Sequence, residues 1–207
     1  MGLLIFGCGN WMKVNLLSPD IYEIEDFITV EEQEEVLSYC QSLDEQEWWQ
    51  SEDEEYKKSF FYGKQKIGEL PEIFNKITNR TNILFSDFLY IGKVALQRQL
   101  GRNFMQPHID YWIKKAEDYV RFGLVIYYND EYEGGEIRYP EINLTHKPKA
   151  RSLVMHGGNI LHGTTEVTSD GYRYFSTCFV RGSVNKPVIL NQETFSNVEQ
   201  SDGSAYP

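Results

Sequence analysis

Short apolar runs separated by turn residues fill the second half of the chain, and this texture constrains the fold more than any other feature. Between residues 90 and 182, runs rich in Val, Ile, Tyr and Phe alternate with Gly, Asn and Asp. Such spacing predicts an all-β sandwich or barrel rather than a helical domain. The candidate turns are Asn129-Asp130, Gly134-Gly135, Gly157-Gly158 and Asp170-Gly171. The last of these is the strongest signal for a hairpin.

Two helices are expected ahead of this β-rich region. Thr29 and Glu32 have the spacing of a capping box, which predicts a helix over residues 30–43. A second helix fits residues 70–85, where Pro71 suits the first turn and apolar side chains recur at helical spacing. The expected fold class is therefore α+β and mainly β, with the N-terminal helices packed on one sheet.

The segment between these helices, residues 44–66, is acidic and carries Trp48 and Trp49. Two interpretations stay open. The segment is either an exposed loop with buried tryptophans or a lid over a binding groove, since segments that gate active sites come from the less stable parts of a fold. As a lid, its acidic side chains would favour a neutral or basic substrate.

Charge and cysteine content argue against several classes of protein. The net charge of −11 lacks the basic footprint of a nucleic-acid-binding protein. The three cysteines are an odd number without a C-x-x-C pair, which argues against a disulfide scaffold or structural zinc and indicates a reducing compartment, the cytoplasm. No apolar stretch approaches the ~20 residues that a membrane span needs. These patterns do not fix the oligomeric state.

The pair His108 and Asp110 is the strongest chemical signal in the chain. Side chains two residues apart in a strand point to the same face, so both can bind one metal ion. A second histidine from elsewhere would complete two histidines and one carboxylate with open coordination positions. Non-haem Fe(II) oxygenases use this arrangement.

His156 and His162 compete for the third ligand position. We favour His162, because Gly163 leaves space beside a metal and Arg173 follows within the reach of one hairpin. The guanidinium of Arg173 can bind a carboxylate through two parallel hydrogen bonds. A metal triad with such a carboxylate clamp indicates an enzyme that uses a 2-oxo acid and O2. His146 stands in a polar stretch and is expected at the surface.

Several ordered sequence blocks extend this interpretation. They are GRNFMQPHID (101–110), RFGLVIYYN (121–129), EGGE (133–136), KPKARSLV (147–154), and LHG (161–163) with GYRY (171–174). In this order the blocks resemble the Fe(II)/2-oxoglutarate-dependent dioxygenases, in particular the prolyl 4-hydroxylase-like group. The resemblance implies a double-stranded β-helix core, which is a jelly roll of the cupin type.

The resemblance also implies a role for each candidate residue. His108, Asp110 and His162 match the iron ligands of that family. Arg173 matches the basic residue that binds the distal carboxylate of 2-oxoglutarate. The implied cofactors are therefore Fe(II) and 2-oxoglutarate, with ascorbate as a candidate reductant, and these four residues are the expected catalytic set.

Other positions are expected to line the cofactor pocket. Tyr127 matches an aromatic position that can hydrogen-bond the distal carboxylate, and Thr177 and Phe179 share a strand face with the clamp arginine. Members of that family often have a tyrosine shortly before the glycine turn, where this chain has Arg98-Gln99-Leu100. Gln97 or Gln99 is expected to serve in its place.

We expect one oxygenase domain over residues 20–196, with helical support over 20–89 and the β-core over 90–182. Residues 1–19 would be an N-terminal extension compatible with disorder, and 197–207 a flexible tail. The expected function is hydroxylation of a C–H bond on a prolyl residue of a peptide or protein, with release of succinate and CO2. The alternatives are an oxygenase for a free amino acid or other small molecule and, from another class, a metal-free jelly-roll binding module. The expected partners are a neutral or basic peptide and O2, not a membrane or nucleic acid.

Overall fold

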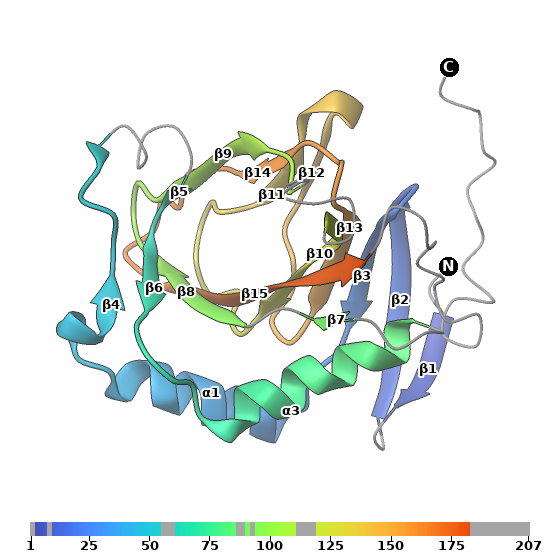
Figure 1. The fold of residues 1–207 in the computed structure, drawn as a ribbon, viewed down its shortest axis with the longest axis horizontal. Helices are drawn as coiled ribbons and strands as arrows, with labels where there is room; N and C mark the ends of the chain where they lie inside the picture. The colour runs from blue at the N-terminus through green and yellow to red at the C-terminus, as the bar shows by residue number, and fades with distance from the viewer. Residues whose placement is uncertain are drawn as a thin grey trace.

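Two antiparallel sheets face each other and form a jelly-roll core, and two helices cover the outer face of the larger sheet (Figure 1). The structure is a computed structural model that describes residues 3–7, 10–54, 61–85, 90–91, 94–110 and 119–182. This architecture confirms the predicted fold class, including the packing of the helices on one sheet.

Within the described residues, the larger sheet contains ten strands. In spatial order its main path is β1 (Leu3–Gly7), β2 (Asn10–Ser18), β3 (Ile21–Glu25), β13 (Leu153–Gly157), β10 (Tyr119–Tyr127), β15 (Arg173–Gly182), β8 (Ala95–Gln99), β6 (Lys64–Lys66) and β4 (Trp48–Trp49). The short strand β7 (Tyr90–Ile91) pairs with β15. Leu124 and Cys178, on the central strands, belong to the main apolar core that the helices close.

In the part of the chain that the structure describes, the smaller sheet contains five strands. Their spatial order is β12 (Leu144–His146), β11 (Ile137–Tyr139), β14 (His162–Thr164), β9 (Phe104–His108) and β5 (Phe61–Tyr62). The chain crosses from the smaller to the larger sheet at Asp170-Gly171, between β14 and β15. The hairpin predicted there is therefore wrong, because a tight turn does not require that its flanking strands pair.

Helix α1 (Val30–Ser42) begins as predicted, with Thr29 as its N-cap. The Thr29 hydroxyl accepts from the backbone N–H of Glu32 at 3.2 Å, and the Glu32 carboxylate accepts from the N–H of Thr29 at 2.9 Å. Helix α3 (Glu72–Arg80) continues into the 3₁₀ turn η2 (Thr81–Leu84) and is shorter than predicted. Within the described residues, neither helix is long and apolar enough to cross a bilayer.

The N-terminal region differs from its prediction. Residues 3–7 and 10–18, expected to belong to an extension compatible with disorder, form β1 and β2. Strand β2 pairs with β3, and its Met12 and Val14 are buried in the main core. The segment therefore adds two strands to the larger sheet. The predicted tail, 197–207, lies outside the described residues.

Candidate active site

Three predicted metal ligands come together at one end of the smaller sheet. His108 and His162 are paired directly across β9 and β14, and their ring centroids are 4.5 Å apart. Asp110 follows two residues after the end of β9. One ligand atom from each residue lies within 4.8 Å of the others. Two imidazoles and a carboxylate at this spacing are a donor set suited to Fe(II).

Backbone carbonyls fix the orientation of both imidazoles. Nδ1 of His108 lies 2.8 Å from the carbonyl oxygen of Gln106, and Nδ1 of His162 lies 2.9 Å from that of Ile160. A carbonyl oxygen only accepts, so Nδ1 carries the proton in each ring. The Nε2 lone pairs therefore face Asp110, whose oxygens lie 3.4 Å from Nε2 of His108 and 3.7 Å from Nε2 of His162. Such hydrogen bonds orient histidines that bind metals.

The ionisation states of the cluster also suit a metal. Burial of His162, with the neighbouring His156 adding to the effect, lowers the pKa of its imidazole to about 3. Burial by itself would raise the pKa of Asp110, but the three neighbouring histidines hold it well below its usual range. At neutral pH, His162 is therefore neutral and Asp110 ionised, which are the forms that bind a cation.

His156, the competing histidine, is also close to the cluster. It lies on β13 in the larger sheet, is fully buried, and places Nε2 3.4 Å from Oδ2 of Asp110. Its ring centroid is 3.9 Å from that of His162. The sequence treated these two histidines as alternatives, whereas the fold brings both to Asp110. Among the described residues, the group whose ligand atoms all lie within 4.8 Å of one another contains His162 and not His156.

The triad opens into a cavity of about 510 Å³ between the two sheets. Apolar walls and a few convergent polar groups are typical of a ligand site. Besides the triad and His156, the polar and charged residues that line it are Gln65, Gln97, Tyr127, Thr164, Arg173, Thr177 and Arg181. Thr177 and Phe179 line the wall formed by β15, together with Arg173.

Arg173 is buried in this cavity, with 1% of its surface exposed. Its Nη1 donates to Oε1 of Gln99 at 2.6 Å, and its guanidinium lies over the rings of Phe175 and Tyr127, at 4.1 and 5.1 Å from their centroids. No carboxylate is hydrogen-bonded to it among the described residues. Glu136 interacts with Arg173 only at longer range. A buried cation without a directly paired carboxylate is costly, so this position suits an anionic ligand.

Several buried polar atoms around Arg173 also make no hydrogen bond within the protein. They are Nε of Arg173, Nε2 of Gln99, and the hydroxyl oxygens of Tyr127 and Tyr132. Burial raises the pKa of both tyrosines even though the positive charge of Arg173 opposes the shift, so their hydroxyls stay protonated and can donate. A ligand carboxylate at this end of the cavity could accept hydrogen bonds from Arg173 and Tyr127, which line it. The residues present thus fit both Fe(II) and 2-oxoglutarate.

The sequence did not reveal the role of Tyr132. This residue is brought to Arg173 by the Gly134-Gly135 turn, in which both glycines have positive φ angles. A Cβ atom at Gly135 would lie 3.0 Å from Cδ of Arg173 and 3.2 Å from Cε2 of Tyr132, so only glycine lets the loop pack this closely. The Gly-Gly pair was the available signal, since it marks a turn that needs left-handed backbone.

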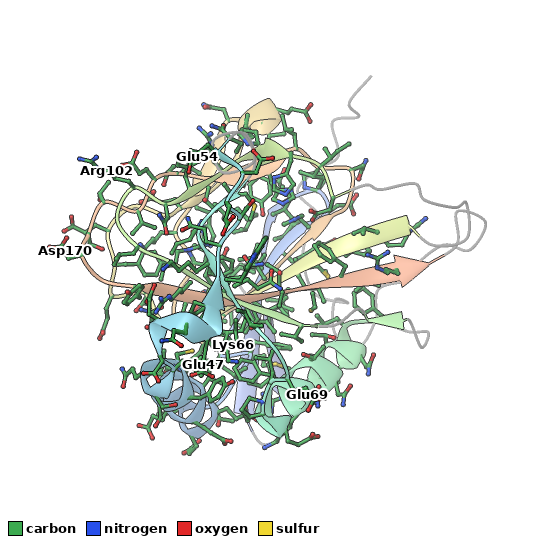
Figure 2. The ribbon with its side chains drawn as sticks, turned by 60° about the vertical axis from the view of Figure 1, so that its left-hand side comes forward. Glu47, Glu54, Lys66, Glu69, Arg102 and Asp170 are labelled. Carbon is green, nitrogen blue, oxygen red and sulfur yellow. The ribbon has the colours of Figure 1, made fainter. Side chains whose placement is uncertain are left out.

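The segment 44–66 borders the cavity. The two tryptophans of β4 point in opposite directions: Trp48 is buried and contacts the Arg98 guanidinium at 4.4 Å, whereas Trp49 is 53% exposed and lines the cavity. Figure 2 shows the segment rising from Glu47, near α1, to Glu54, at the level of the smaller sheet. Residues 55–60 lie outside the described residues, so the choice between loop and lid stays a prediction.

Comparisons with known proteins agree with this site. Residues 94–181 match the 2OG-Fe(II) oxygenase superfamily. No curated protein matches the sequence.

Solved structures show the same fold. A viral collagen prolyl hydroxylase from Paramecium Bursaria Chlorella virus-1, in complex with 2OG, has a TM-score of 0.58 and 16% identity, over 79% of this chain and 96% of that chain. A prolyl hydroxylase from Trichoplax adhaerens, in complex with a hypoxia inducible factor peptide, has a TM-score of 0.54 and 13% identity, over 87% and 88% of the chains. HygX from Streptomyces hygroscopicus, with nickel, 2-oxoglutarate and hygromycin B bound, has a TM-score of 0.57 and 11% identity, over 80% and 84% of the chains.

At these identities the solved structures establish the fold alone. The match over residues 94–181 covers both candidate histidines, Asp110 and Arg173, and the fold around them is that of the superfamily. The cofactors are accordingly Fe(II) and 2-oxoglutarate. The part of the chain that carries the site, residues 94–181, is therefore similar to the 2OG-Fe(II) oxygenase superfamily.

Proposed function

We propose that this dioxygenase hydroxylates a prolyl residue of a peptide or protein. One oxygen atom of O2 enters a C–H bond of the substrate, and the other enters succinate as 2-oxoglutarate loses CO2. The observation that carries the proposal is that a cluster of metal donors and a buried guanidinium share one cavity. In this proposal His108, Asp110 and His162 hold Fe(II), while Arg173 and Tyr127 bind the distal carboxylate of 2-oxoglutarate.

The register of β15 supports these roles. Phe179 pairs with Gly123, whose Cα lies beside Asp110, so Phe179 marks the level of the metal along the strand. Thr177 and then Arg173 lie on the same face of β15, further from the level of the metal. Bound Fe(II) and 2-oxoglutarate supply the O2-activating chemistry, and the protein supplies position and exclusion of water. This wall would align 2-oxoglutarate between the metal and Arg173.

A prolyl substrate is supported by the cavity mouth and by the neighbours. Trp49 presents an exposed ring at the cavity, and an aromatic face can pack on a pyrrolidine ring. Two of the similar structures are prolyl hydroxylases, and one of them holds a peptide. The segment 44–66, as the proposed lid, would cover such a peptide.

A second candidate substrate is a small molecule that carries a carboxylate, such as a free amino acid. Arg181 lines the cavity two residues beyond Phe179, on the side of the metal level opposite Arg173. Among the described residues that line the cavity, Asp110 contributes the one carboxylate. A guanidinium has five N–H donors, so Arg181 can bind a substrate anion in addition to its contacts within the protein. This charge also opposes the predicted preference for a basic peptide.

Succinate release from 2-oxoglutarate, measured with Fe(II) under air, tests the proposal. Prolyl peptides with neutral, basic or acidic flanking residues are compared with free proline and other amino acids, and mass spectrometry detects the addition of one oxygen atom. Stimulation by a prolyl peptide with a hydroxyproline product is expected. Hydroxylation of free amino acids alone, with dependence on Arg181, would favour the second candidate, and the absence of any succinate would refute both.

A further inference from the structure

His156 connects Asp110 to the opposite sheet through a buried chain of polar contacts. Nε2 of His156 lies 3.4 Å from Oδ2 of Asp110, and its Nδ1 lies 3.3 Å from the hydroxyl oxygen of Tyr139. Both His156 and Tyr139 are fully buried. His156 is on β13 of the larger sheet and Tyr139 ends β11 of the smaller one. The chain Tyr139–His156–Asp110 therefore joins the sheets directly behind the metal cluster.

The direction of these hydrogen bonds follows from their chemistry. An ionised carboxylate only accepts, so Nε2 of His156 is the donor to Asp110. A neutral imidazole then has its lone pair on Nδ1, where the Tyr139 hydroxyl donates. Burial raises the pKa of Tyr139 well above its ordinary value, so the hydroxyl keeps the proton that this bond needs. In this arrangement each contact of the chain joins one donor and one acceptor.

Gly123 makes space for this contact. It is paired with His156 across β10 and β13. A Cβ atom at position 123 would lie 2.5 Å from Oδ2 of Asp110 and 2.7 Å from Nε2 of His156. Real Cβ atoms do not approach other atoms so closely, so any other residue would displace the hydrogen-bonded pair. A strand-centre glycine weakens a sheet, and here it allows the carboxylate and imidazole to meet.

We propose that His156 is a positioning residue that fixes the carboxylate of Asp110 for metal binding, and that Tyr139 holds His156 in the required tautomer. The bond to Oδ2 leaves Oδ1 and a second lone pair directed at the cluster. The inference rests on the proposed function only for the metal site and is independent of the organic substrate. Loss of such an outer partner typically weakens metal binding about 10- to 100-fold.

Binding of Co(II) to the full chain without 2-oxoglutarate tests the proposal, by calorimetry and by the visible absorption of the bound ion. We expect His156→Leu to weaken Co(II) binding about 10- to 100-fold. His156→Gln keeps an N–H donor and should restore most of the affinity. Tyr139→Phe should cause a smaller loss that disappears in the His156→Leu background, because both substitutions break the same chain. His146→Leu and His146→Gln, at the histidine that pairs with Glu23, are the matched controls and should leave Co(II) affinity unchanged.

Each other outcome overturns a defined part of the reasoning. Unchanged affinity in His156→Leu, or a His156→Gln variant as weak as His156→Leu, would refute positioning by a donated hydrogen bond. A loss as complete as in Asp110→Ala, with a changed absorption spectrum, would make His156 a direct ligand instead. Failure of the wild-type chain to bind Co(II) would refute the metal site and the proposed function together. If His156→Leu does not fold, the nearly isosteric His156→Gln and Tyr139→Phe decide the question.

Discussion

Arg173 offers the most direct test of how this fold holds 2-oxoglutarate. Its guanidinium is buried, donates to Gln99 at 2.6 Å, and faces the unpaired hydroxyls of Tyr127 and Tyr132. In Arg173→Ala, the distal carboxylate would stay buried without its cationic partner. Loss of one member of a buried charge pair costs about 2–5 kcal/mol. At ~1.4 kcal/mol per tenfold, the Kd for 2-oxoglutarate should rise from roughly 30-fold to several-thousand-fold.

The assay is calorimetric titration of the metal-loaded protein with 2-oxoglutarate, supported by the KM for succinate release. Arg173→Lys keeps the charge but loses the two-pronged donor geometry, so its Kd should rise less than in Arg173→Ala. Tyr127→Phe removes one hydroxyl donor and should raise the Kd about tenfold, as expected for a hydrogen bond of ~1.5 kcal/mol. Substrate hydroxylation at saturating 2-oxoglutarate should persist in both milder variants.

Arg98 provides a matched control on the neighbouring strand. It is nearly as buried as Arg173, but its guanidinium points to the other face of β8, between the rings of Trp48 and Tyr172 at 4.4 and 4.6 Å. Arg98→Ala should lower the free energy of unfolding and leave the Kd for 2-oxoglutarate unchanged. A folded Arg173→Ala variant whose Kd matches that of the wild type would refute the assignment of the clamp.

Four further outcomes follow from the structure. Asp110→Ala and His162→Ala should each abolish metal binding and succinate formation, and turnover that survives either change would contradict the triad. Glu32→Gln should lower the free energy of unfolding in urea by about 3 kcal/mol, because the buried Glu32 carboxylate pairs with Arg80 as well as capping α1, while 2-oxoglutarate affinity stays unchanged. Burial would raise the pKa of Glu25, but its bonds with two lysines lower it to about 2. The stabilisation by the Glu25 carboxylate is therefore present above pH ~4.5 and lost as pH falls through about 2. A difference in stability between wild type and Glu25→Gln that does not close toward pH 2 would contradict this pH dependence. Trp49→Ala should raise the KM for a prolyl peptide and leave uncoupled 2-oxoglutarate turnover intact, whereas normal peptide kinetics would identify the segment 44–66 as a bystander.

The sequence predicted those features that depend on local geometry. His108 and Asp110 are two residues apart, so any extended backbone brings them to one face. The capping box at Thr29 and Glu32 acts within one helical turn, and α1 begins where the pattern placed it. The third candidate ligand, His162, lies far from His108 in sequence. Local geometry could not place it, but the family-like order of the sequence blocks supported its choice.

Features that depend on contacts between distant segments were missed. Asp170-Gly171 marks a turn, but whether its flanking strands pair depends on strands elsewhere, and β14 and β15 pair with different sheets. Residues 10–18 form a strand by pairing with β3, and this pairing cannot be seen in their own sequence. His156 and Tyr132 contact residues more than 30 positions away in sequence, Asp110 and Arg173 respectively. The Gly134-Gly135 pair marks the turn beside Tyr132, but no local pattern shows which distant side chains these two residues meet.

One reason for preferring His162 as the third ligand, the space that Gly163 would leave, does not match the structure. Gly163 was expected to leave space beside the metal. In the fold, a Cβ atom at Gly163 would instead meet the backbone of β9, 2.7 Å from the carbonyl oxygen of Met105 and 2.9 Å from the nitrogen of Pro107. The glycine therefore lets β14 lie against β9 at the irregularity between His162 and Thr164. This close approach sets His162 opposite His108, so Gly163 affects the candidate metal site through the pairing of the strands that carry the two histidines.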